Sequence, residues 1–522
     1  MEHEMGVAEK VENSGKTNRD FFFEKIDFKH IEQSAFGILL PIFACAILSL
    51  AISFMSCSCP FAVSDAGDDS HVFKYIGHIM TLGFVPYVDT FDHKGPVLYL
   101  INYLGSLINT YWGVWFFELL AIFLVHILSY RYARRYLGKI ASVLLLLLIS
   151  ASYYEFYDCG NYTENYALPA IIGSLIIFRD YFAEHTITKL RLILCGFTFA
   201  WVLMLQPNMI ALWITGCLFV LIDACRRKEL NRVPGFILYF IIGAAILILP
   251  ILIRLGSKGA LKEFFQCYIG FNFIYTHSDS WVTAADIRDT LFYFLCKSYL
   301  LLSLFFIAIR VAMKRSTCSV FFLVYSLLSM YLMALSGHQW VHYTCPFFSI
   351  YLCGFTVLFN WFKTSKHKLV RRCVLICTAI FFLCIPLMHY ISLGRTVLSA
   401  LSSFQNAESK VSTTIMDVCK LIDQYTDETD CIAVYGNRSE FYLFSNRLSA
   451  TYYSYTAPIF DIDSTLSDIY FEEFESNPPA AIVTTISTDR MTEFCSSHHY
   501  QIVYNAEDIV LYLSPDSLSS TD

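Results

Sequence analysis

Charged side chains are scarce in this sequence: only 16% of its 522 residues are Asp, Glu, Lys or Arg, whereas 56% are apolar and 17% are aromatic. A soluble domain has roughly 25% charged residues, so this composition excludes an ordinary cytosolic enzyme and a disordered chain. The formal net charge of −7 provides no basic surplus, and we therefore expect no nucleic-acid partner. The composition is that of a membrane protein with many spans and some soluble mass.

Several sequence signals are also missing. Residues 1–33 are polar and contain no short apolar segment with a cleavage site, which predicts a cytoplasmic N-terminal segment without a removable signal peptide. We find no glycine-rich phosphate loop, no internal repeat and no low-complexity tract. Most of the 18 cysteines lie in apolar runs, and no cluster has metal-site spacing, so no metal ligand is predicted and metal dependence stays open. A disulfide between residues such as Cys159 and Cys267 also stays open.

Long apolar runs are the main feature that the chain does have. A run of about 20 residues is long enough to cross the roughly 30 Å hydrocarbon core of a membrane as a helix. The runs predict an α-helical polytopic membrane domain over residues 34–391 with about 11 spans. They lie near 34–55, 113–131, 140–154, 166–178, 190–206, 208–224, 235–254, 289–309, 318–336, 346–363 and 372–391.

Positive charges give this domain a predicted orientation. Alternate loops hold clusters such as Arg131, Arg134 and Arg135, whereas the short loops 153–165 and 337–345 have no Lys or Arg. The positive-inside rule therefore places the N-terminus in the cytoplasm and the C-terminal region outside.

The apolar stretch 96–109 is too short for an ordinary span, and counting it as one would invert every later loop. We interpret it as an interfacial or re-entrant helix on the outer face. Residues 57–112 then form one long outer loop, and long loops usually carry function.

The composition changes again from about Ser392. Short apolar runs alternate there with helix-like stretches, which predicts a small extracytoplasmic α/β domain over 392–522. The expected strands are 432–435, 482–485 and 509–513, and the expected helices are 413–424 and 489–497.

Polar side chains gather in four clusters, all on the predicted outer face. Ionisable groups close to a membrane are costly to keep there, so these clusters are candidate sites. They are residues 64–71, 86–96, 161–166 and 337–343.

Two residues of these clusters suit a transfer reaction. A carboxylate beside apolar walls, such as Asp69, has a raised basicity and can act as a general base. A cation such as Lys94 can hold a phosphate leaving group. Each also has a structural alternative: Asp68 or Asp69 could be a helix N-cap, and Lys94 could contact lipid headgroups. Glu164 could merely stabilise the N-terminus of the following helix through its negative charge, and His342 could belong to an interfacial aromatic belt.

The outer-loop pattern resembles that of GT-C membrane glycosyltransferases. Residues Gly67–Phe73, Gly83–Tyr87 and Phe91–Pro96 resemble the first outer loop of bacterial members of glycosyltransferase family 39 and of the RgtA/B/C/D-like group. These are distant relatives of protein O-mannosyltransferases and lipid A aminoarabinose transferases. Residues Asn161–Pro169 resemble a second element of the group, and the resemblance covers most of residues 34–391.

The resemblance implies transfer of a sugar from a polyprenyl-phosphate-linked donor to a cell-envelope glycan, lipid or protein acceptor. The reaction would invert the anomeric carbon, on the outer face of the plasma membrane. Asp69 matches the proposed base, with Asp68 as the alternative, and Lys94 matches the basic residue near the lipid phosphate. Many relatives have Lys-Pro-Pro where this chain has Lys94–Gly95–Pro96, and an acidic doublet in relatives is often Asp-Glu, whereas Ser70 follows Asp69 here.

The remaining residues of the clusters are predicted to bind the substrates. We expect Asp92 to orient Lys94, His93 or His342 to help neutralise the phosphate, and Glu164 to contact the sugar or the acceptor. The alternative functions are a flippase or transporter of a lipid-linked saccharide, and a non-catalytic envelope scaffold. The spans are almost free of charge, which favours chemistry at one face over a transport pathway. The predicted substrate-binding residues are Asp92, His93, Lys94, Asn161, Glu164, His342 and Tyr343.

Overall fold

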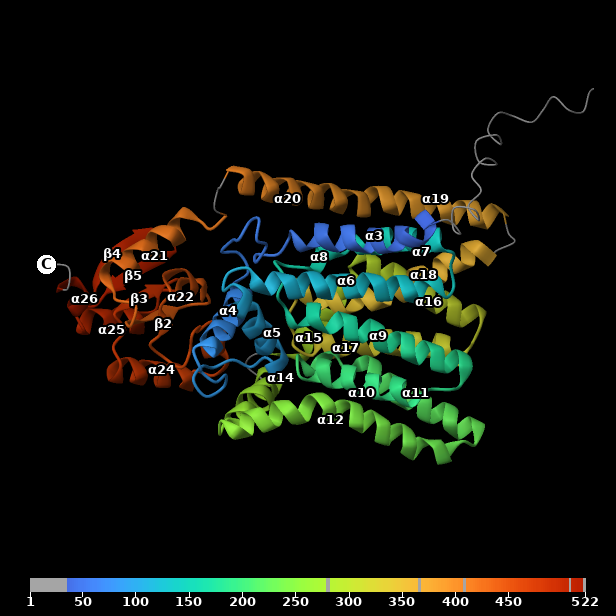
Figure 1. Ribbon diagram of the computed structural model, residues 1–522, viewed down its shortest axis with the longest axis horizontal. Coiled ribbons are helices and arrows are strands. Elements are labelled where there is room, and N and C mark those ends of the chain that lie inside the picture. The colour runs from blue at the N-terminus through green and yellow to red at the C-terminus, as the bar shows by residue number, and fades with distance from the viewer. Residues whose placement is uncertain (1–34, 278–281, 365–367, 407–409, 507, 520–522) are drawn as a thin grey trace, which may run out of the picture.

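A computed structural model describes residues 35–277, 282–364, 368–406, 410–506 and 508–519. Long helices lie side by side in a bundle, and a smaller α/β unit covers one end of it (Figure 1). We call the covered end the domain end and the opposite one the far end. The predicted cytoplasmic segment 1–33 lies outside the described residues.

The bundle consists of long helices joined by short helical turns. Its long helices are α3 (Ala35–Ser53), α6 (Gly113–Arg134), α7 (Lys139–Ser150), α9 (Thr163–Glu184), α10 (Lys189–Leu203), α11 (Ala211–Arg227), α12 (Val233–Ser257), α15 (Ala284–Leu295), α16 (Ser298–Met313), α17 (Thr317–Ala334), α18 (Phe348–Thr364), α19 (Lys368–Cys384) and α20 (Pro386–Asn406). Its short turns are α8 (Tyr153–Phe156), η1 (Pro207–Met209), η2 (Leu230–Arg232), α13 (Leu261–Phe264), η3 (Phe265–Phe271), α14 (Asn272–His277) and η4 (Val341–Phe347).

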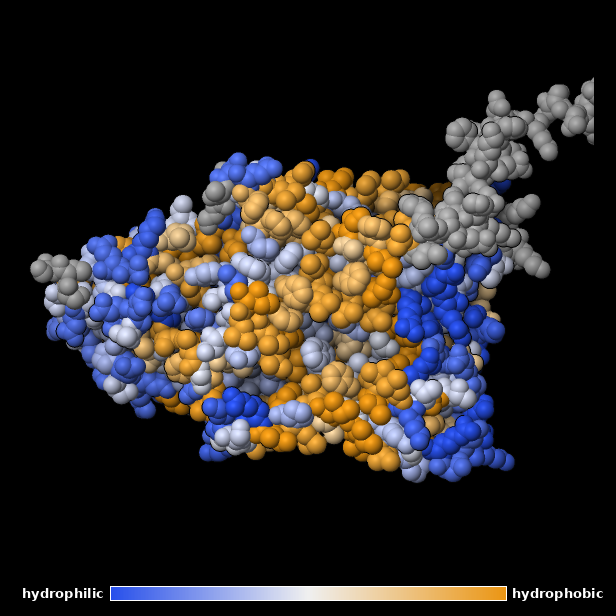
Figure 2. Space-filling model, viewed as in Figure 1, coloured by the Kyte–Doolittle hydropathy of each residue, from blue (hydrophilic) through white to orange (hydrophobic). Residues whose placement is uncertain are grey.

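The predicted apolar runs fall on these helices, and two of the runs, 289–309 and 372–391, are each divided between two consecutive helices, α15 and α16 or α19 and α20. Within the described residues, seven helices are long and apolar enough to cross a membrane, or eight if the bent pair α15 and α16 counts as one span. Helices α10 and α11 have only 15 and 17 residues, so the number of about 11 spans stays a prediction. The surface of the bundle is largely hydrophobic between hydrophilic surfaces at its two ends (Figure 2), as expected for a multi-pass membrane protein.

Two shorter helices lie at the domain end, between the bundle and the α/β unit. They are α4 (Asp68–Thr81) and α5 (Pro96–Ile108), and α5 packs along both α4 and α6. The 13 residues of α5 make it the short apolar helix that the sequence predicts, begun by a proline at its first turn.

The C-terminal unit is α/β, as predicted, and contains one mixed sheet. Strands β1 (Cys431–Tyr435), β2 (Leu448–Ser449), β3 (Ala481–Thr484), β4 (Gln501–Ala506) and β5 (Ile509–Leu513) are arranged in the order β2-β1-β3-β5-β4. Strand β1 pairs in parallel with β2 and β3, whereas β5 runs antiparallel to β3 and β4. The helices are α21 (Thr413–Tyr425), α22 (Glu440–Ser445), α23 (Ile459–Ile462), α24 (Thr465–Ser476), α25 (Asp489–Ser497) and α26 (Pro515–Ser519).

Three of these strands and helices α21 and α25 lie where the sequence places them. Strand β4 was not predicted. Its side chains are exposed or half-buried, and a strand is recognisable from hydrophobicity mainly when its residues form a buried apolar run. The predicted boundary at 392 falls inside α20, which continues to Asn406, and the α/β fold itself begins at α21.

Helix α4 joins the α/β unit to the rest of the chain. Tyr75 and Ile79 of α4 belong to the same buried cluster as Ile432 of β1. The Tyr75 ring stacks on Tyr442 at 4.7 Å, and the Tyr75 hydroxyl accepts a hydrogen bond of 2.8 Å from the backbone N–H of Ser449. Burying one such aromatic side chain contributes about 1.5–3 kcal/mol, so the unit is docked on the start of the outer-loop region rather than loosely tethered.

Candidate active site

Two predicted catalytic residues open helix α4. The N-cap position is Gly67, which has φ 84°, and neither Asp68 nor Asp69 caps the helix through its side chain. The N-cap alternative is therefore wrong: both carboxylates occupy the first turn, where the helix dipole favours negative charge. Asp68 is exposed and Asp69 is half-buried.

A strained loop brings a third carboxylate to the same place. Residues 158–161, between α8 and α9, have φ values of 44°, 64°, 80° and 60°, all in the left-handed region. Glu118 of α6 holds this loop, because it accepts hydrogen bonds from the backbone N–H of Asn161 (2.6 Å) and the hydroxyl of Ser56 (2.7 Å). A Cβ at Gly160 would lie 2.0 Å from Oε1 of Glu118, so only glycine fits there.

The carboxylate presented by this loop is Asp158, which the sequence analysis did not single out. Its Oδ2 lies 3.3 Å from Nδ1 of His342, whose ring stacks on Tyr162 at 4.1 Å. Partial desolvation raises the pKa of Asp68, and the charges of Asp69 and Asp158 add to this effect. Asp68, Asp69 and Asp158 therefore form one acidic cluster, with His342 beside it.

The predicted phosphate-binding residues precede α5. Asp92 is buried (2% exposed), and its Oδ1 accepts hydrogen bonds from the backbone N–H of His93 (2.6 Å) and the hydroxyl of Tyr455 (2.9 Å). The Lys94 Nζ lies 3.2 Å from Nε2 of His93. Burial and the neighbouring Lys94 hold the pKa of His93 well below its ordinary value, so the imidazole is neutral and its Nε2 can accept from the ammonium group.

Asp92 is connected to Lys94 through the ring of His93. Burial raises the pKa of Asp92 although the charge of Lys94 opposes this. In the described part of the chain no Asp92–Lys94 ion pair lies within 4 Å; the contact runs through the His93 ring, whose Nδ1 is 3.4 Å from Asp92. The expected orientation of Lys94 by Asp92 stays a prediction, with His93 as the connecting group.

Gly95 explains why this chain departs from the Lys-Pro-Pro pattern. Its backbone N–H donates to the carbonyl oxygen of Leu205 (3.1 Å), and a proline has no N–H to donate. A Cβ at this position would lie 2.0 Å from the carbonyl oxygen of Met204. The loop that carries Lys94 is thus fixed against the end of α10.

The C-terminal domain supplies residues that the sequence analysis missed. The Asn437 side-chain amide donates to Oδ1 of Asp69 (3.2 Å), and Arg438 forms an ion pair with the buried Glu440. Burial raises the pKa of Glu440 to about 7. These residues follow the carboxyl end of strand β1, the edge at which parallel sheets usually bind ligands, and that position was the available signal.

Tyr455 links the two halves of the site. Its hydroxyl donates to Asp92, and its ring lies near that of Phe91. Burial and the charge of Asp92 raise the pKa of Tyr455, and the charge of Asp69 adds to the effect. Asp69 of α4 and Asp92 of the Asp92–His93–Lys94 segment therefore both act on one hydroxyl from the C-terminal domain.

The contacts of three further predicted substrate-binding residues are with neighbouring side chains of the protein. Asn161 is fully buried and its amide exchanges hydrogen bonds with Asn102. Glu164 is 1% exposed; one oxygen accepts from the Thr163 hydroxyl (2.9 Å), and Oε1 meets no hydrogen-bonding group of the described residues. Tyr343 packs edge-on against the His342 ring at 5.0 Å. Substrate contact by these three residues stays a prediction.

Metal ligands and disulfides were left open by the sequence. Among the described residues, no group of three or more His, Cys, Asp or Glu side chains is placed to hold a metal ion. All 18 cysteines lie within the described residues and are free thiols, so Cys159 and Cys267 are not bonded to each other.

Solved structures share this arrangement of helices and C-terminal domain. ArnT from Cupriavidus metallidurans bound to undecaprenyl phosphate is similar over 92% of this chain and 98% of its own length, with a TM-score of 0.60 and 13% identity. Its apo structure gives a TM-score of 0.60 and 12% identity over 93% of this chain and 99% of its own. The archaeal oligosaccharyltransferase AglB from Archaeoglobus fulgidus shows a weaker likeness, with a TM-score of 0.49 and 12% identity over 86% of this chain and 70% of its own.

The likeness to ArnT confirms the predicted GT-C fold. No curated protein matches the sequence. Residues 38–372, more than half of the sequence, match the family model described as the putative competence-induced protein Ccs4 N-terminal domain, and the chain therefore belongs to that family.

Proposed function

We propose that this protein is a membrane glycosyltransferase that moves a sugar from a polyprenyl-phosphate-linked donor to a cell-envelope glycan, lipid or protein acceptor. The observation that carries the proposal is that one buried hydroxyl, that of Tyr455, donates to Asp92 of the segment that holds His93 and Lys94 and also lies within reach of the charge of Asp69. The GT-C fold supports the reaction class, and undecaprenyl phosphate, bound by ArnT, is a ligand of the donor's chemical class.

In the proposed reaction, Asp69 is the general base. It removes the proton of the acceptor hydroxyl while the acceptor oxygen bonds to the anomeric carbon from the face opposite the phosphate. The bond between that carbon and the phosphate oxygen breaks, and polyprenyl phosphate leaves with the electron pair. The configuration at the anomeric carbon is inverted.

Asp69 suits this role better than Asp68. Asp69 is half-buried, and Asn437 holds its Oδ1, which leaves Oδ2 for the acceptor proton. Asp68 is exposed, and although partial desolvation raises its pKa, the positive charge of Arg438 lies close enough to stabilise its carboxylate. A fixed carboxylate costs less reorganisation in the transition state than a mobile one.

Lys94 is proposed to stabilise the departing phosphate. The neutral His93 imidazole beside it is not a counter-ion, and a cation at this position gains importance as the negative charge of the leaving group grows. His93 then positions Lys94, and buried Asp92 positions His93.

The proposed orientation puts the domain end outside the plasma membrane. Helices α6, α11 and α18 reach the far end at their basic last turns (Figure 1). A basic far end fits the cytoplasmic side under the positive-inside rule, and the site and the α/β domain are then extracytoplasmic.

Mass spectrometry of polyprenyl-phosphate sugars and envelope glycans tests the proposal. Cells lacking the gene are compared with cells complemented by wild type, by Asp69→Asn, or by Asp461→Asn, an exposed aspartate of α23. We expect one glycan to lose a sugar and its lipid-linked donor to accumulate, with rescue by wild type and Asp461→Asn but not by Asp69→Asn. Unchanged glycans with the lipid-linked sugar stranded on the inner leaflet would instead support a flippase.

A further inference from the structure

A membrane-facing groove runs from Tyr166, whose hydroxyl donates to Asn161, toward the end of the bundle that is away from the candidate active site. It has a volume of about 530 Å³, within the range of ligand sites, and its walls come from α6, α9 and α10. The lining is almost entirely apolar, and rim side chains such as Leu120, Leu124 and Leu194 are exposed on the hydrophobic surface of the bundle. The groove therefore opens sideways toward lipid.

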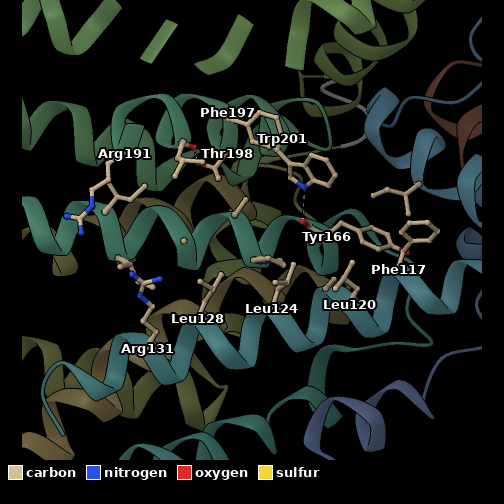
Figure 3. Close-up of a pocket in the computed structure, with 18 of the residues that line it drawn as sticks. Phe117, Leu120, Leu124, Leu128, Arg131, Tyr166, Arg191, Phe197, Thr198 and Trp201 are labelled. Carbon is tan, nitrogen blue, oxygen red and sulfur yellow. Dashed lines mark hydrogen bonds between the residues drawn. The ribbon is translucent and has the colours of Figure 1, made fainter. Parts of the chain in front are cut away.

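Two arginines end the groove, as Figure 3 shows. Phe117 and Trp201 lie toward one end, whereas Arg131 and Arg191 both lie at the opposite end. Arg131 belongs to the last turn of α6 and Arg191 to the first turn of α10, so the basic end is at the far end of the bundle.

The protein does not neutralise this basic end. Asp180 is the acidic residue of the lining, and it already pairs with Arg179 at 2.6 Å and with Arg191 at 3.4 Å. Arg131 is exposed and forms no ion pair with any residue that the structure describes. Arg179 and Arg191 thus share one carboxylate while Arg131 adds a further positive charge, which leaves an excess positive charge at this end of the groove. Guanidinium groups bind phosphate through paired hydrogen bonds.

The groove has the dimensions of a lipid chain. On α6, Phe117 and Arg131 are separated by about 21 Å at a rise of about 1.5 Å per residue. This exceeds half of the roughly 30 Å hydrocarbon core, so the groove extends from the headgroup level to beyond the bilayer midplane. Gly173 keeps the floor open, because a Cβ there would meet only Leu128 Cδ1, at 4.0 Å.

We infer that the groove binds one anionic phospholipid, with its phosphate at Arg131 and Arg191 and an acyl chain along the apolar wall. The inference does not depend on sugar transfer. The donor's phosphate is expected at Lys94, at the domain end, whereas the cations of the groove lie at the far end. Charge complementarity therefore assigns the groove to a lipid of the far-end leaflet.

Native mass spectrometry of the purified full chain tests this site. The protein is mixed with phosphatidylglycerol or with phosphatidylcholine, and lipid retained per chain is measured for wild type and the double variant Arg131→Gln/Arg191→Gln. We expect wild type to retain one phosphatidylglycerol in preference to phosphatidylcholine and the double variant to bind it at least about tenfold more weakly, since two charge-assisted contacts are lost. The charge-matched control, Arg226→Gln/Arg227→Gln, changes arginines of α11 that do not line the groove and should retain the lipid.

A second pair of variants tests the groove by volume rather than charge. Gly173→Leu should fill the floor and displace the acyl chain, whereas Gly235→Leu on α12, where a Cβ meets no atom within 4 Å, should have no effect. If Gly173→Leu fails to fold, lipid retention by the Arg131→Gln/Arg191→Gln variant still tests the site. Equal retention by wild type and the Arg131/Arg191 variant, or equal retention of both lipids, would overturn the inference. So would polyprenyl phosphate binding that depends on Gly173 but not on the arginines, which would give the groove to the donor.

Discussion

The candidate site has two halves that differ in what they contribute. The outer-loop half supplies the charges, with Asp69 at the start of α4 and Lys94 before α5. The α/β half supplies mainly hydrogen bonds to those charges: Asn437 to Asp69, and Tyr455 to Asp92. The carboxylate that the α/β half places near the site, Glu440, is fully buried and paired with Arg438.

This difference separates chemistry from positioning. A group that gains or loses a proton, or that faces the departing phosphate, acts directly on the transition state, and its loss is expected to cost orders of magnitude in rate. A group that orients another side chain acts on the population of the productive arrangement, so its loss should cost less. Substitutions in the outer-loop half are therefore expected to have larger effects than those in the α/β half.

The largest effect is expected from Asp69→Asn. The amide cannot accept the acceptor proton, so kcat should fall by about 10²–10⁴-fold, the range for loss of a general base. The measurement is single-turnover transfer by purified protein, with Asp68→Asn as the matched neighbour. A small loss in Asp68→Asn confirms the choice between the two aspartates; the reverse pattern moves the base to Asp68.

Lys94→Ala is expected to come next. Removing the cation should lower kcat/KM for the donor by about 10²-fold, the lower end of what one electrostatic contact to a developing charge contributes. The dependence on acceptor concentration should change much less. Lys420→Ala is the control, since this exposed lysine pairs with Asp417 on α21, outside the candidate site. If kcat/KM fell equally for donor and acceptor, a specific contact of Lys94 with the donor phosphate would be excluded.

The same division explains how much the sequence could predict. The membrane domain could be predicted because spans are recognisable from hydrophobicity alone. Asp69 and Lys94 could be predicted because the outer-loop residues lie within 30 positions of one another in a dense polar pattern. Asn437 contacts Asp69 across 368 positions, and Tyr455 contacts Asp92 across 363. No local pattern encodes such contacts, because they depend on how α4 docks against the sheet.

Asp158 escaped prediction for a different reason. Its position in the site follows from four successive residues in the left-handed conformation, and Glu118, near the start of α6, holds this loop by a hydrogen bond. Asp158, Gly160 and Asn161 are of the residue types that adopt the left-handed region most readily, but such residues are found in many loops. That all four residues adopt it in succession depends on tertiary contacts such as the one from Glu118.

Tyr455→Phe tests the α/β half with a smaller expected effect. The change keeps the ring and removes the hydroxyl that donates to Asp92. A hydrogen bond to a charged group contributes about 1.5–3 kcal/mol, and because it acts on Lys94 only through His93, we expect about a tenfold loss in kcat/KM for the donor. The acidic limb of the pH–rate profile should also move upward, since Asp92 loses a group that lowers its pKa. Tyr453→Phe is the matched control; an unchanged pH profile in Tyr455→Phe would mean that the hydroxyl is only structural.

Glu440 gives the smallest effect, and it appears in stability rather than in rate. Its pKa is about 7 in the folded protein against an ordinary value of 4.5, so between these values the folded state binds the proton more tightly than the unfolded state. Stability must then fall as the pH rises through this window, because ionising a buried carboxylate is costly even beside Arg438. Glu440→Gln cannot ionise, so its melting temperature should decrease less between pH 5 and pH 8 than that of wild type, by a few degrees. The raised pKa values of Asp68 and Asp92 are common to both proteins and cancel in the difference. Parallel pH curves would show that Glu440 stays ionised throughout, and its ion pair with Arg438 would then hold the loop beside Asp69 at every pH.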